Sequence, residues 1–541
     1  MLYSYPTNRQ LISKFSCRLG GMVRAYVMLL AFLVVSVSIV HANQQIEIPV
    51  LFGDNMVLQR GKANPVWGWF TPGAAVKVSI ERDTHEAQAD KDGRWEVILK
   101  SRDAGGPFTL TIQAGEESKI LSNIMFGEVW LCSGQSNMNM PLSNSESGEE
   151  AVKNANHPNI RMIKVPRKPV QELQKDFPFP AKWGVCSPET VPDMSALAYY
   201  FAKDISENLN VPVGIIQIAA GGSSIEAWIE RKILDADERF EPMMSKWRET
   251  ESHSWDAEAE AAKYQSELSE WEAAKIAAER DGKAVPRRPS APVNPLESRG
   301  RPGNFYGGML SPAVGYGIRG VLWYQGESNA GREAEYALLF PTLIKSWREA
   351  WKDPNLPFFW VQLASFGPVM PVNDGSWAGI REAQGKTLTL PNTGQVVTTD
   401  LGDAKNIHPL RKKEVGDRLA QLVLAEVYQV RKPDIAPFYE NHKFADGKAI
   451  IQIGPDDAIV DIKPTNDYTG FVIAGEDKVF RPAKIRIIKT GVIEVSSDKV
   501  AAPVAVRYSW ADNPPFSVFS SSGLPLAPFR TDSWDHTTFQ D

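Results

Sequence analysis

The chain has 541 residues, which is long for one compact domain and suggests two to four. Its 43% hydrophobic and 23% charged residues are ordinary for a globular protein, so a sizeable core is feasible. The net charge of −6 argues against a nucleic-acid partner.

Residues 1–42 have the pattern of a secretory signal peptide. Arg24 precedes an apolar run over 25–40, and a small-residue cleavage site ends at Ala42. The run is near the lower length limit for crossing a bilayer, so an uncleaved anchor is the alternative. We expect cleavage after Ala42, a secreted or periplasmic protein, and no stable membrane association afterwards.

Residues 43–124 are predicted to form an N-terminal β-sandwich domain. Short β-rich runs alternate there with Pro-Gly, Asp-Gly and Gly-Gly-Pro turn signals, and we expect strands over 65–69, 75–80, 95–99 and 108–112. Nothing in this region resembles a chemical site.

Residues 125–433 are predicted to form an α/β domain with a parallel sheet, because strands and helices alternate from Phe126 onward. The expected strands cover 129–131, 213–219, 316–325, 356–363 and 395–399, and the clearest helices cover 196–209 and 414–428.

An insertion is expected at 231–300, with a charged helix that has one narrow apolar face (Tyr264, Leu268, Trp271) and a proline-rich segment. We interpret it as a flap or a surface for packing. Residues 434–541 are β-rich again and predict a C-terminal β domain.

Two cysteines, Cys132 and Cys186, follow the leader. They either form a disulfide or are two buried thiols, and the sequence does not decide between these states. Clusters of His and Cys with metal-ligand spacing are absent from the sequence, so no metal is expected.

Polar loops follow four of the predicted strands, at 134–137, 220–224, 325–329 and 400–409. In α/β folds, sites lie at the carboxyl ends of parallel strands. A Gly turn directly after a strand would lift the hydroxyl of Ser136 clear of the sheet, as a serine nucleophile requires. An ordinary polar loop is the alternative, and Met138 stands where a G-x-S-x-G elbow would have its second glycine.

His408 is the candidate base, because an imidazole titrates near neutrality and this one lies in a polar loop after a sheet strand. The tetrahedral intermediate of acyl transfer needs hydrogen-bond donors. The backbone N–H groups of Ser136 and Gly222 and a carboxamide from Gln325 or Asn329 could supply them. We favour Gln325, which stands at the strand end.

Three segments, GQSNM (134–138), YQGESN (324–329) and DLGDAKNIHP (400–409), together resemble the sialate O-acetylesterase family of SGNH/GDSL hydrolases. The resemblance extends to LFGDNMVLQR (51–60) and GLPLAPFRTDSW (523–534). It implies a flavodoxin-like three-layer α/β/α domain, Ser136 as nucleophile, His408 as base and an oxyanion hole from Ser136, Gly222 and Gln325. Supporting roles are expected for Gln135, Asn137, Glu327 and Asn329.

The sequence departs from the common SGNH pattern at Lys405, where an Asp usually stands three residues before the histidine. The group that orients His408 must then be Asp403, which we favour, or Asp400, or a backbone carbonyl in a Ser–His dyad.

These observations predict a carbohydrate esterase that removes O-acetyl groups from a sugar or glycan through an acetyl-enzyme, without a cofactor. An acetylesterase acting on xylan or another plant polysaccharide is the alternative within the enzyme class. A non-catalytic glycan-binding protein is the alternative outside it. The sequence gives no oligomeric state.

Overall fold

The computed structural model describes residues 45–372, 375–432, 434–455, 460–462, 469–534 and 538–539. The predicted signal peptide, 1–42, lies outside these ranges. Of the helices within them, none has the length and apolar character needed to cross a membrane.

The N-terminal β region consists of a sheet in the order β4-β3-β6-β7-β1 and the separate pair β2-β5. Alternate residues of β3 are buried, as expected for a sheet with one face on a core. β7 runs without a break past residue 124, where the sequence predicted a domain boundary. The strands are β1 (Val57–Gln59), β2 (Asn64–Trp69), β3 (Ala75–Ile80), β4 (Asp83–Gln88), β5 (Arg94–Leu99), β6 (Gly105–Ala114) and β7 (Glu117–Gly134).

The second half of β7 is the middle of a parallel sheet in the order β13-β12-β11-β7-β10-β8, with β9 antiparallel at the edge. Without β8 and β9, chain order across the sheet is 2-1-3-4-5, the flavodoxin-like order. The expected fold class is therefore confirmed. The further strands are β8 (His157–Lys164), β9 (Gly184–Cys186), β10 (Val213–Ala219), β11 (Gly320–Tyr324), β12 (Phe358–Val361) and β13 (Thr393–Val396).

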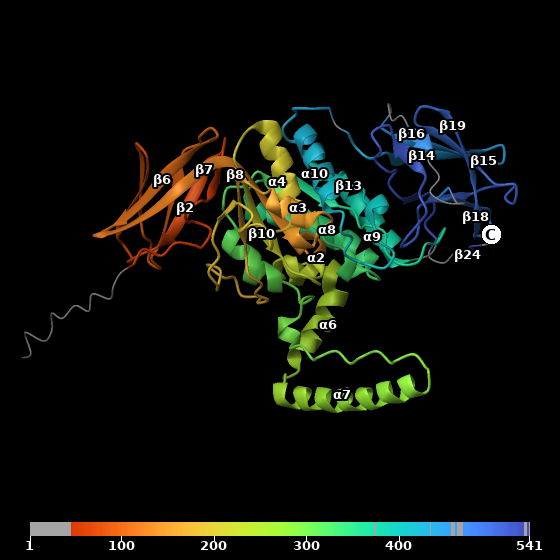
Figure 1. Ribbon diagram of the computed structural model, residues 1–541, viewed down its shortest axis with the longest axis horizontal. Coiled ribbons are helices and arrows are strands. Elements are labelled where there is room, and N and C mark those ends of the chain that lie inside the picture. Colours follow the sequence, from red (N-terminus) through yellow and green to blue (C-terminus); the bar gives the residue numbers. More distant parts are fainter. Residues whose placement is uncertain are drawn as a thin grey trace, which may run out of the picture. The chain divides into compact units, whose positions relative to one another are not determined.

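Helices cover both faces of this sheet (Figure 1). Trp130 of β7 lies opposite Gly320 in the pairing and contacts Phe201 of α4. Trp323 is three residues beyond Gly320, hence on the other face, and contacts Phe340 of α8. Helix α4 starts at Ala196, as predicted, after a Ser195 cap, and packs with α10. The helices are α2 (Ser136–Asn139), α3 (Gly148–Lys153), α4 (Ala196–Leu209), α8 (Glu333–Ala350), α9 (Ser376–Lys386) and α10 (Lys412–Glu426).

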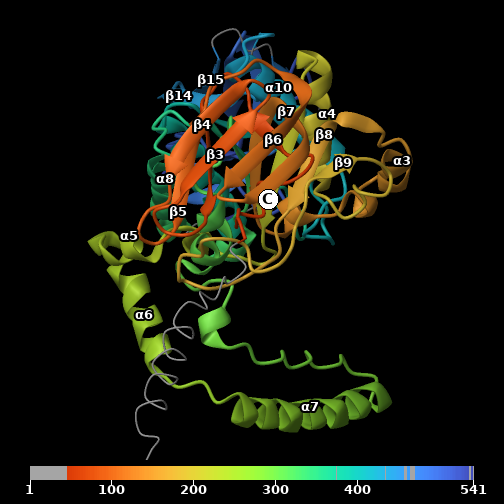
Figure 2. The same ribbon diagram turned by 90° about the vertical axis from the view of Figure 1, so that its left-hand side faces the viewer.

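The insertion forms α5 (Arg231–Asp235), α6 (Glu241–Ser252) and α7 (Ala257–Arg280). Asp256 caps α7 by accepting hydrogen bonds from two backbone N–H groups. The proline-rich segment returns alongside α7, where Trp271 Nε1 donates to the carbonyl of Pro286 at 2.8 Å. Figures 1 and 2 show the helix and this segment side by side, outside the layers of the central sheet.

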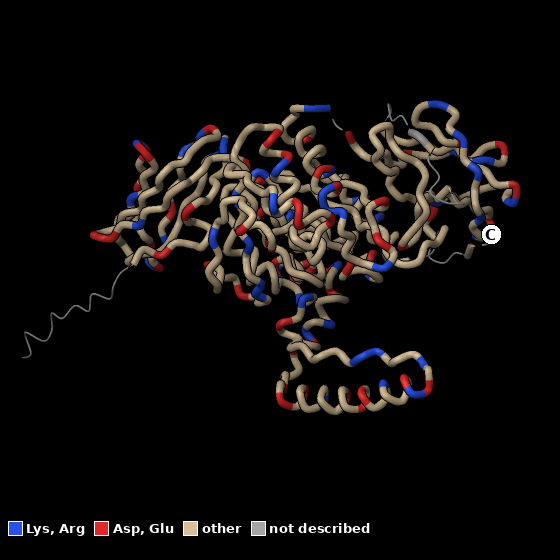
Figure 3. Tube along the Cα trace, viewed as in Figure 1, with Lys and Arg blue, Asp and Glu red and all other residues tan. Residues whose placement is uncertain are grey.

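The C-terminal region is built of β strands, as predicted, in the sheets β14-β15-β20-β19, β23-β21-β17-β18-β24 and β16-β22. Acidic and basic residues are interspersed over this region, the central helices and the N-terminal sheet (Figure 3). The strands are β14 (Phe438–Ala445), β15 (Lys448–Gly454), β16 (Val460–Ile462), β17 (Phe471–Ala474), β18 (Val479–Pro482), β19 (Lys484–Lys489), β20 (Val492–Ser496), β21 (Ala505–Tyr508), β22 (Val518–Ser520), β23 (Phe529–Arg530) and β24 (Thr538–Phe539).

Arg381 of α9 joins the loop after β12 to the C-terminal region. Its buried guanidinium donates to the carbonyls of Leu363 (2.7 Å) and Ala364 (3.0 Å) on one side. On the other side it donates to the carbonyls of Ala511 (2.7 Å) and Asp512 (2.8 Å). Burial lowers the pKa of Arg381 to about 10, so the side chain stays charged at neutral pH.

Replacing Arg381 by methionine should destabilise the protein, because four carbonyls would lose a hydrogen bond and those of Leu363 and Ala511 are buried. We expect the free energy of unfolding to fall by ~2–5 kcal/mol, seen as a lower thermal midpoint. Arg486→Met is the control, since Arg486 of β19 is exposed and pairs with Glu494 of β20. Equal midpoints for the two variants would contradict this role of Arg381.

Gly134, at the end of β7, has φ +134°, and a Cβ there would lie 2.2 Å from the carbonyl oxygen of Tyr324. Gly134→Ala must therefore separate β7 from β11, at a cost of ~2–4 kcal/mol measured by thermal unfolding. Gly385→Ala in α9 is the matched control. A Cβ at Gly385 meets nothing within 4 Å, so this change should stabilise the helix by ~0.5–1 kcal/mol. An unchanged thermal midpoint for Gly134→Ala would contradict the close pairing of β7 with β11.

Candidate active site

Ser136 and His408 meet at the carboxyl edge of the parallel sheet. β7 ends at Gly134, and Ser136 is the first residue of the short helix α2. His408 lies in the loop between β13 and α10, and its Nε2 is 2.7 Å from Ser136 Oγ. Both residues are half-buried. The structure therefore brings together two groups that are 272 positions apart in the chain, with the hydroxyl in contact with a potential base.

The surroundings of His408 favour its neutral form. Burial lowers the pKa of the imidazole, and the positive charge of Lys412 lowers it further. A neutral imidazole can accept the proton of a serine hydroxyl at neutral pH. The backbone N–H of His408 donates to Asn406 Oδ1 at 3.0 Å, which fixes the turn leading into the imidazole.

Neither Asp403 nor Asp400 is hydrogen-bonded to His408 in the residues that the structure describes. Asp403 is exposed, and its Oδ1 accepts the backbone N–H groups of Lys405 (2.8 Å) and Asn406 (3.2 Å). The Asp400 carboxylate forms an ion pair with Arg418 at 2.5 Å. As it stands, the arrangement is a Ser–His pair, and an orienting role for Asp403 stays a prediction.

The backbone N–H groups of Ser136 and Gly222 have no acceptor within the described part of the chain. The loop after β10 reaches the serine, since a Cβ on Gly221 would lie 3.6 Å from Ser136 Cβ. Gly222 has φ +71°, a conformation that favours glycine. Both groups are thus free to donate to an incoming oxygen.

Gln325 is buried at the end of β11, but its amide already has partners. Nε2 donates to the carbonyl of Ser223 (3.1 Å) and to Asn329 Oδ1 (2.7 Å), and each bond uses one hydrogen. Asn329 Nδ2 in turn donates to Glu226 Oε2 at 3.0 Å. Donation from Gln325 to a reacting oxygen would therefore require it to give up one of these bonds, and that role also stays a prediction.

Three of the expected supporting residues tie neighbouring loops together. Gln135 Oε1 accepts the backbone N–H groups of Gly326 (3.4 Å) and Ser328 (3.3 Å). Asn137 Nδ2 donates to Glu327 Oε1 at 2.5 Å. These bonds join the start of α2 to the loop after β11.

Lys412 is not among the site residues expected from the sequence, yet its buried Nζ donates to Asn137 Oδ1 at 2.8 Å. Its spacing could have identified it, because Lys412, Val415 and Leu419 fall at i, i+3 and i+7 on the buried face of α10.

Cys132 and Cys186 are both buried free thiols. Of the two states that the sequence left open, the structure therefore shows the unpaired one. Burial raises the pKa of both thiols, that of Cys186 to about 11, which makes neither a nucleophile at neutral pH. No group of three or more His, Cys, Asp or Glu side chains is arranged to hold a metal ion in the described ranges.

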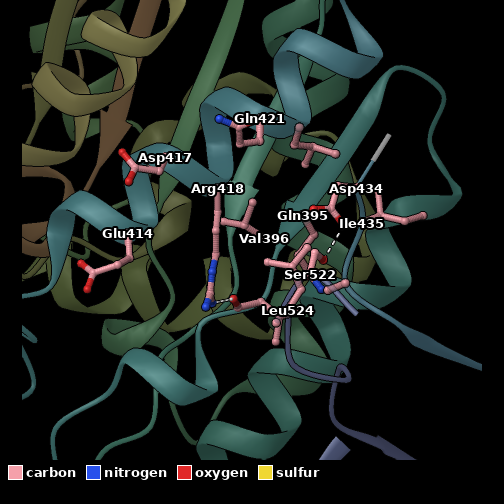
Figure 4. Close-up of a pocket in the computed structure, with 14 residues that line it drawn as sticks. Gln395, Val396, Glu414, Asp417, Arg418, Gln421, Asp434, Ile435, Ser522 and Leu524 are labelled. Atoms are coloured by element: carbon pink, nitrogen blue, oxygen red, sulfur yellow. Dashed lines mark hydrogen bonds between the residues drawn. The ribbon is translucent and has the colours of Figure 1, made fainter. Parts of the chain in front are cut away.

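A pocket of about 280 Å³ lies between α10, β13 and the C-terminal region (Figure 4). Its lining includes Glu414, Arg418 and Ser522, and neither Ser136 nor His408 takes part. It is therefore separate from the Ser–His pair.

Comparison with known proteins agrees with this geometry. A family model described as "Carbohydrate esterase, sialic acid-specific acetylesterase" matches residues 126–268 and 298–425. Sialate O-acetylesterases of Pongo abelii and Homo sapiens are each 27% identical over 523 residues, covering 88% of this chain and 90% of theirs. The crystal structure of a carbohydrate acetylesterase from Xanthomonas citri is 32% identical, with a TM-score of 0.75, covering 90% of this chain and all of the other. The chain therefore belongs to the sialic acid-specific acetylesterase family of carbohydrate esterases and is an esterase.

Proposed function

We propose that this esterase removes O-acetyl groups from sugars with Ser136 as nucleophile and His408 as general base. The observation that carries the proposal is the 2.7 Å contact between Ser136 Oγ and His408 Nε2 at the sheet edge. The names of the relatives support acetyl esters as substrates.

In this reaction Ser136 Oγ attacks the acetyl carbonyl carbon and passes its proton to His408 Nε2. The N–H groups of Ser136 and Gly222 donate to the oxyanion, with Gln325 as the third candidate donor. The bond between the acetyl carbon and the sugar oxygen then breaks, and His408 returns the proton to that oxygen. Water attacks the acetyl-enzyme with His408 again as base, and acetate and free Ser136 result.

We further propose an anionic sugar such as sialic acid as the substrate, rather than acetylated xylan. The acyl-transfer chemistry requires only the acetyl group of the substrate. The choice between an anionic and a neutral sugar therefore depends on the charged side chains beside the site. A Cβ on Gly222 would lie 2.9 Å from Arg299 Nη1, so this guanidinium lies against the proposed oxyanion donor. Arg167 is near enough for Arg299 to lower its pKa, after the larger effect of burial. Neither arginine forms an ion pair with a described residue, although Glu297 attracts Arg167 from a distance. Both guanidinium groups can therefore still pair with a carboxylate.

Localisation and domain limits are proposed from the sequence pattern. We propose that residues 1–42 are removed and that the mature enzyme is secreted or periplasmic. The proposed division is 43–124, 125–433 with the 231–300 insertion, and 434–541, with β7 shared by the first two regions.

Ser136→Ala should reduce acetate release from O-acetylated sialic acid by at least ~10³-fold, because the acetyl-enzyme cannot form. Ser133→Ala is the matched control. Ser133 lies on the same strand, and its buried Oγ has no partner in the described structure, so activity should be kept. Equal activity of the two variants would overturn the serine mechanism. Glycan binding without acetate release by the wild type would favour the glycan-binding alternative.

Arg299→Gln should raise KM for O-acetylated sialic acid by ~5–100-fold, the range for a lost charge-assisted hydrogen bond. KM for the uncharged 4-nitrophenyl acetate should change less than ~2-fold. Arg288→Gln is the control, because Arg288 belongs to the same insertion and lies over Trp271 instead. Similar effects on both substrates, or faster release from acetylated xylan than from sialic acid, would contradict the anionic substrate.

A further inference from the structure

Lys412 is an ionisable side chain with no exposure to solvent, beside the Ser–His pair. Its Nζ donates to two acceptors, Asn137 Oδ1 at 2.8 Å and the carbonyl of Pro409 at 2.7 Å. Asn137 directly follows Ser136, and Pro409 directly follows His408. One ammonium group therefore holds both segments that carry the reacting side chains.

The other end of the Asn137 amide, Nδ2, makes two further hydrogen bonds. It donates to Glu327 Oε1 at 2.5 Å and to the carbonyl of Ile407 at 3.1 Å. The amide orientation is fixed by its partners, since an ammonium can only donate and both neighbours of Nδ2 accept. The carbonyls on either side of His408, those of Ile407 and Pro409, are thus tied to Asn137 and Lys412.

We propose that Lys412 is a positioning residue of this esterase, which through Asn137 and Pro409 fixes the His408 loop against the helix that carries Ser136. The inference rests on the proposed function. It explains how a loop imidazole without a carboxylate partner keeps its place, because rigid backbone contacts do the orienting. A displacement of about 1 Å at such a site can cost ~10²-fold in rate.

Lys412 also acts on His408 through its charge. The groups that face the ammonium are Glu327 from the loop after β11, the ring of Tyr324 at 5.4 Å and His408 itself. Burial lowers the pKa of Lys412 to about 7, against the opposing attraction of Glu327, and burial raises the pKa of Glu327. The positive charge disfavours protonation of His408, so its removal should raise the pKa of His408.

The test compares Lys412→Met with Lys413→Met. Lys413 is the next residue, exposed, and paired with Asp417 at 2.6 Å, so its loss should leave activity unchanged. Lys412→Met should lower kcat by ~10–100-fold with KM changed less than ~3-fold. The acid limb of kcat/KM should also move to higher pH, because His408 becomes easier to protonate.

Two further measurements keep the proposal falsifiable. If Lys412→Met does not fold, Asn137→Ala removes the same bridge and should show the same loss of kcat. An NMR titration of His408 in the Ser136→Ala background, with and without Lys412→Met, reads its pKa without any turnover and so stays informative if the proposed function fails. Unchanged kcat, or an unshifted acid limb and titration, would overturn the role of Lys412.

Discussion

The pairing of β7 with β10 on one side and β11 on the other is the constraint on which the site depends. Ala219 and Tyr324 both pair with Gly134, so three strands end at the same level. The loops that follow carry Ser136, Gly222 and Gln325, and parallel pairing makes them neighbours. The Trp residues on both faces of the sheet pack against helices and hold these strand ends in place. The polar edge is therefore built on a rigid apolar layer, which suits a site that must keep its donors aligned.

The His408 loop follows the edge strand β13, two strands away from β11, and is held in place by separate contacts. No carboxylate in the described structure reaches the imidazole, and the backbone on both sides of it is instead held by Asn137 and Lys412. Such a buried polar network is stable only if its members are paired. Burial lowers the pKa of His408, and the charge of protonated Lys412 lowers it further, which favours a neutral imidazole able to accept a proton. Lys412 thus contributes both to the position of the base and to its protonation state.

The C-terminal region is attached to α9 and to the loop after β12 by contacts of charged side chains. Arg381 binds carbonyls on both sides of the joint, and Arg530 pairs with Glu382 of α9 at 2.9 Å. The N-terminal region is joined at Glu128, a buried carboxylate on β7 that pairs with Arg60 and Arg319. Burial would raise the pKa of Glu128, but the hydrogen bonds from the two arginines lower it overall. Both β regions are therefore fixed to the central sheet by groups that are costly to separate.

The sequence by itself determined the fold class, most strands and the helices α4 and α10, because these follow from local periodicity. It also identified Ser136 and His408 as candidates, since each follows a predicted strand. The contact between them, the engagement of both Gln325 hydrogens, the exposure of Asp403 and the free state of the cysteines were decided only by the tertiary structure. Lys412 illustrates why the sequence alone could not reveal these features. Its role comes from Asn137 and Pro409, and the 275 positions between Lys412 and Asn137 are bridged only when the sheet has assembled and both loops meet at its edge.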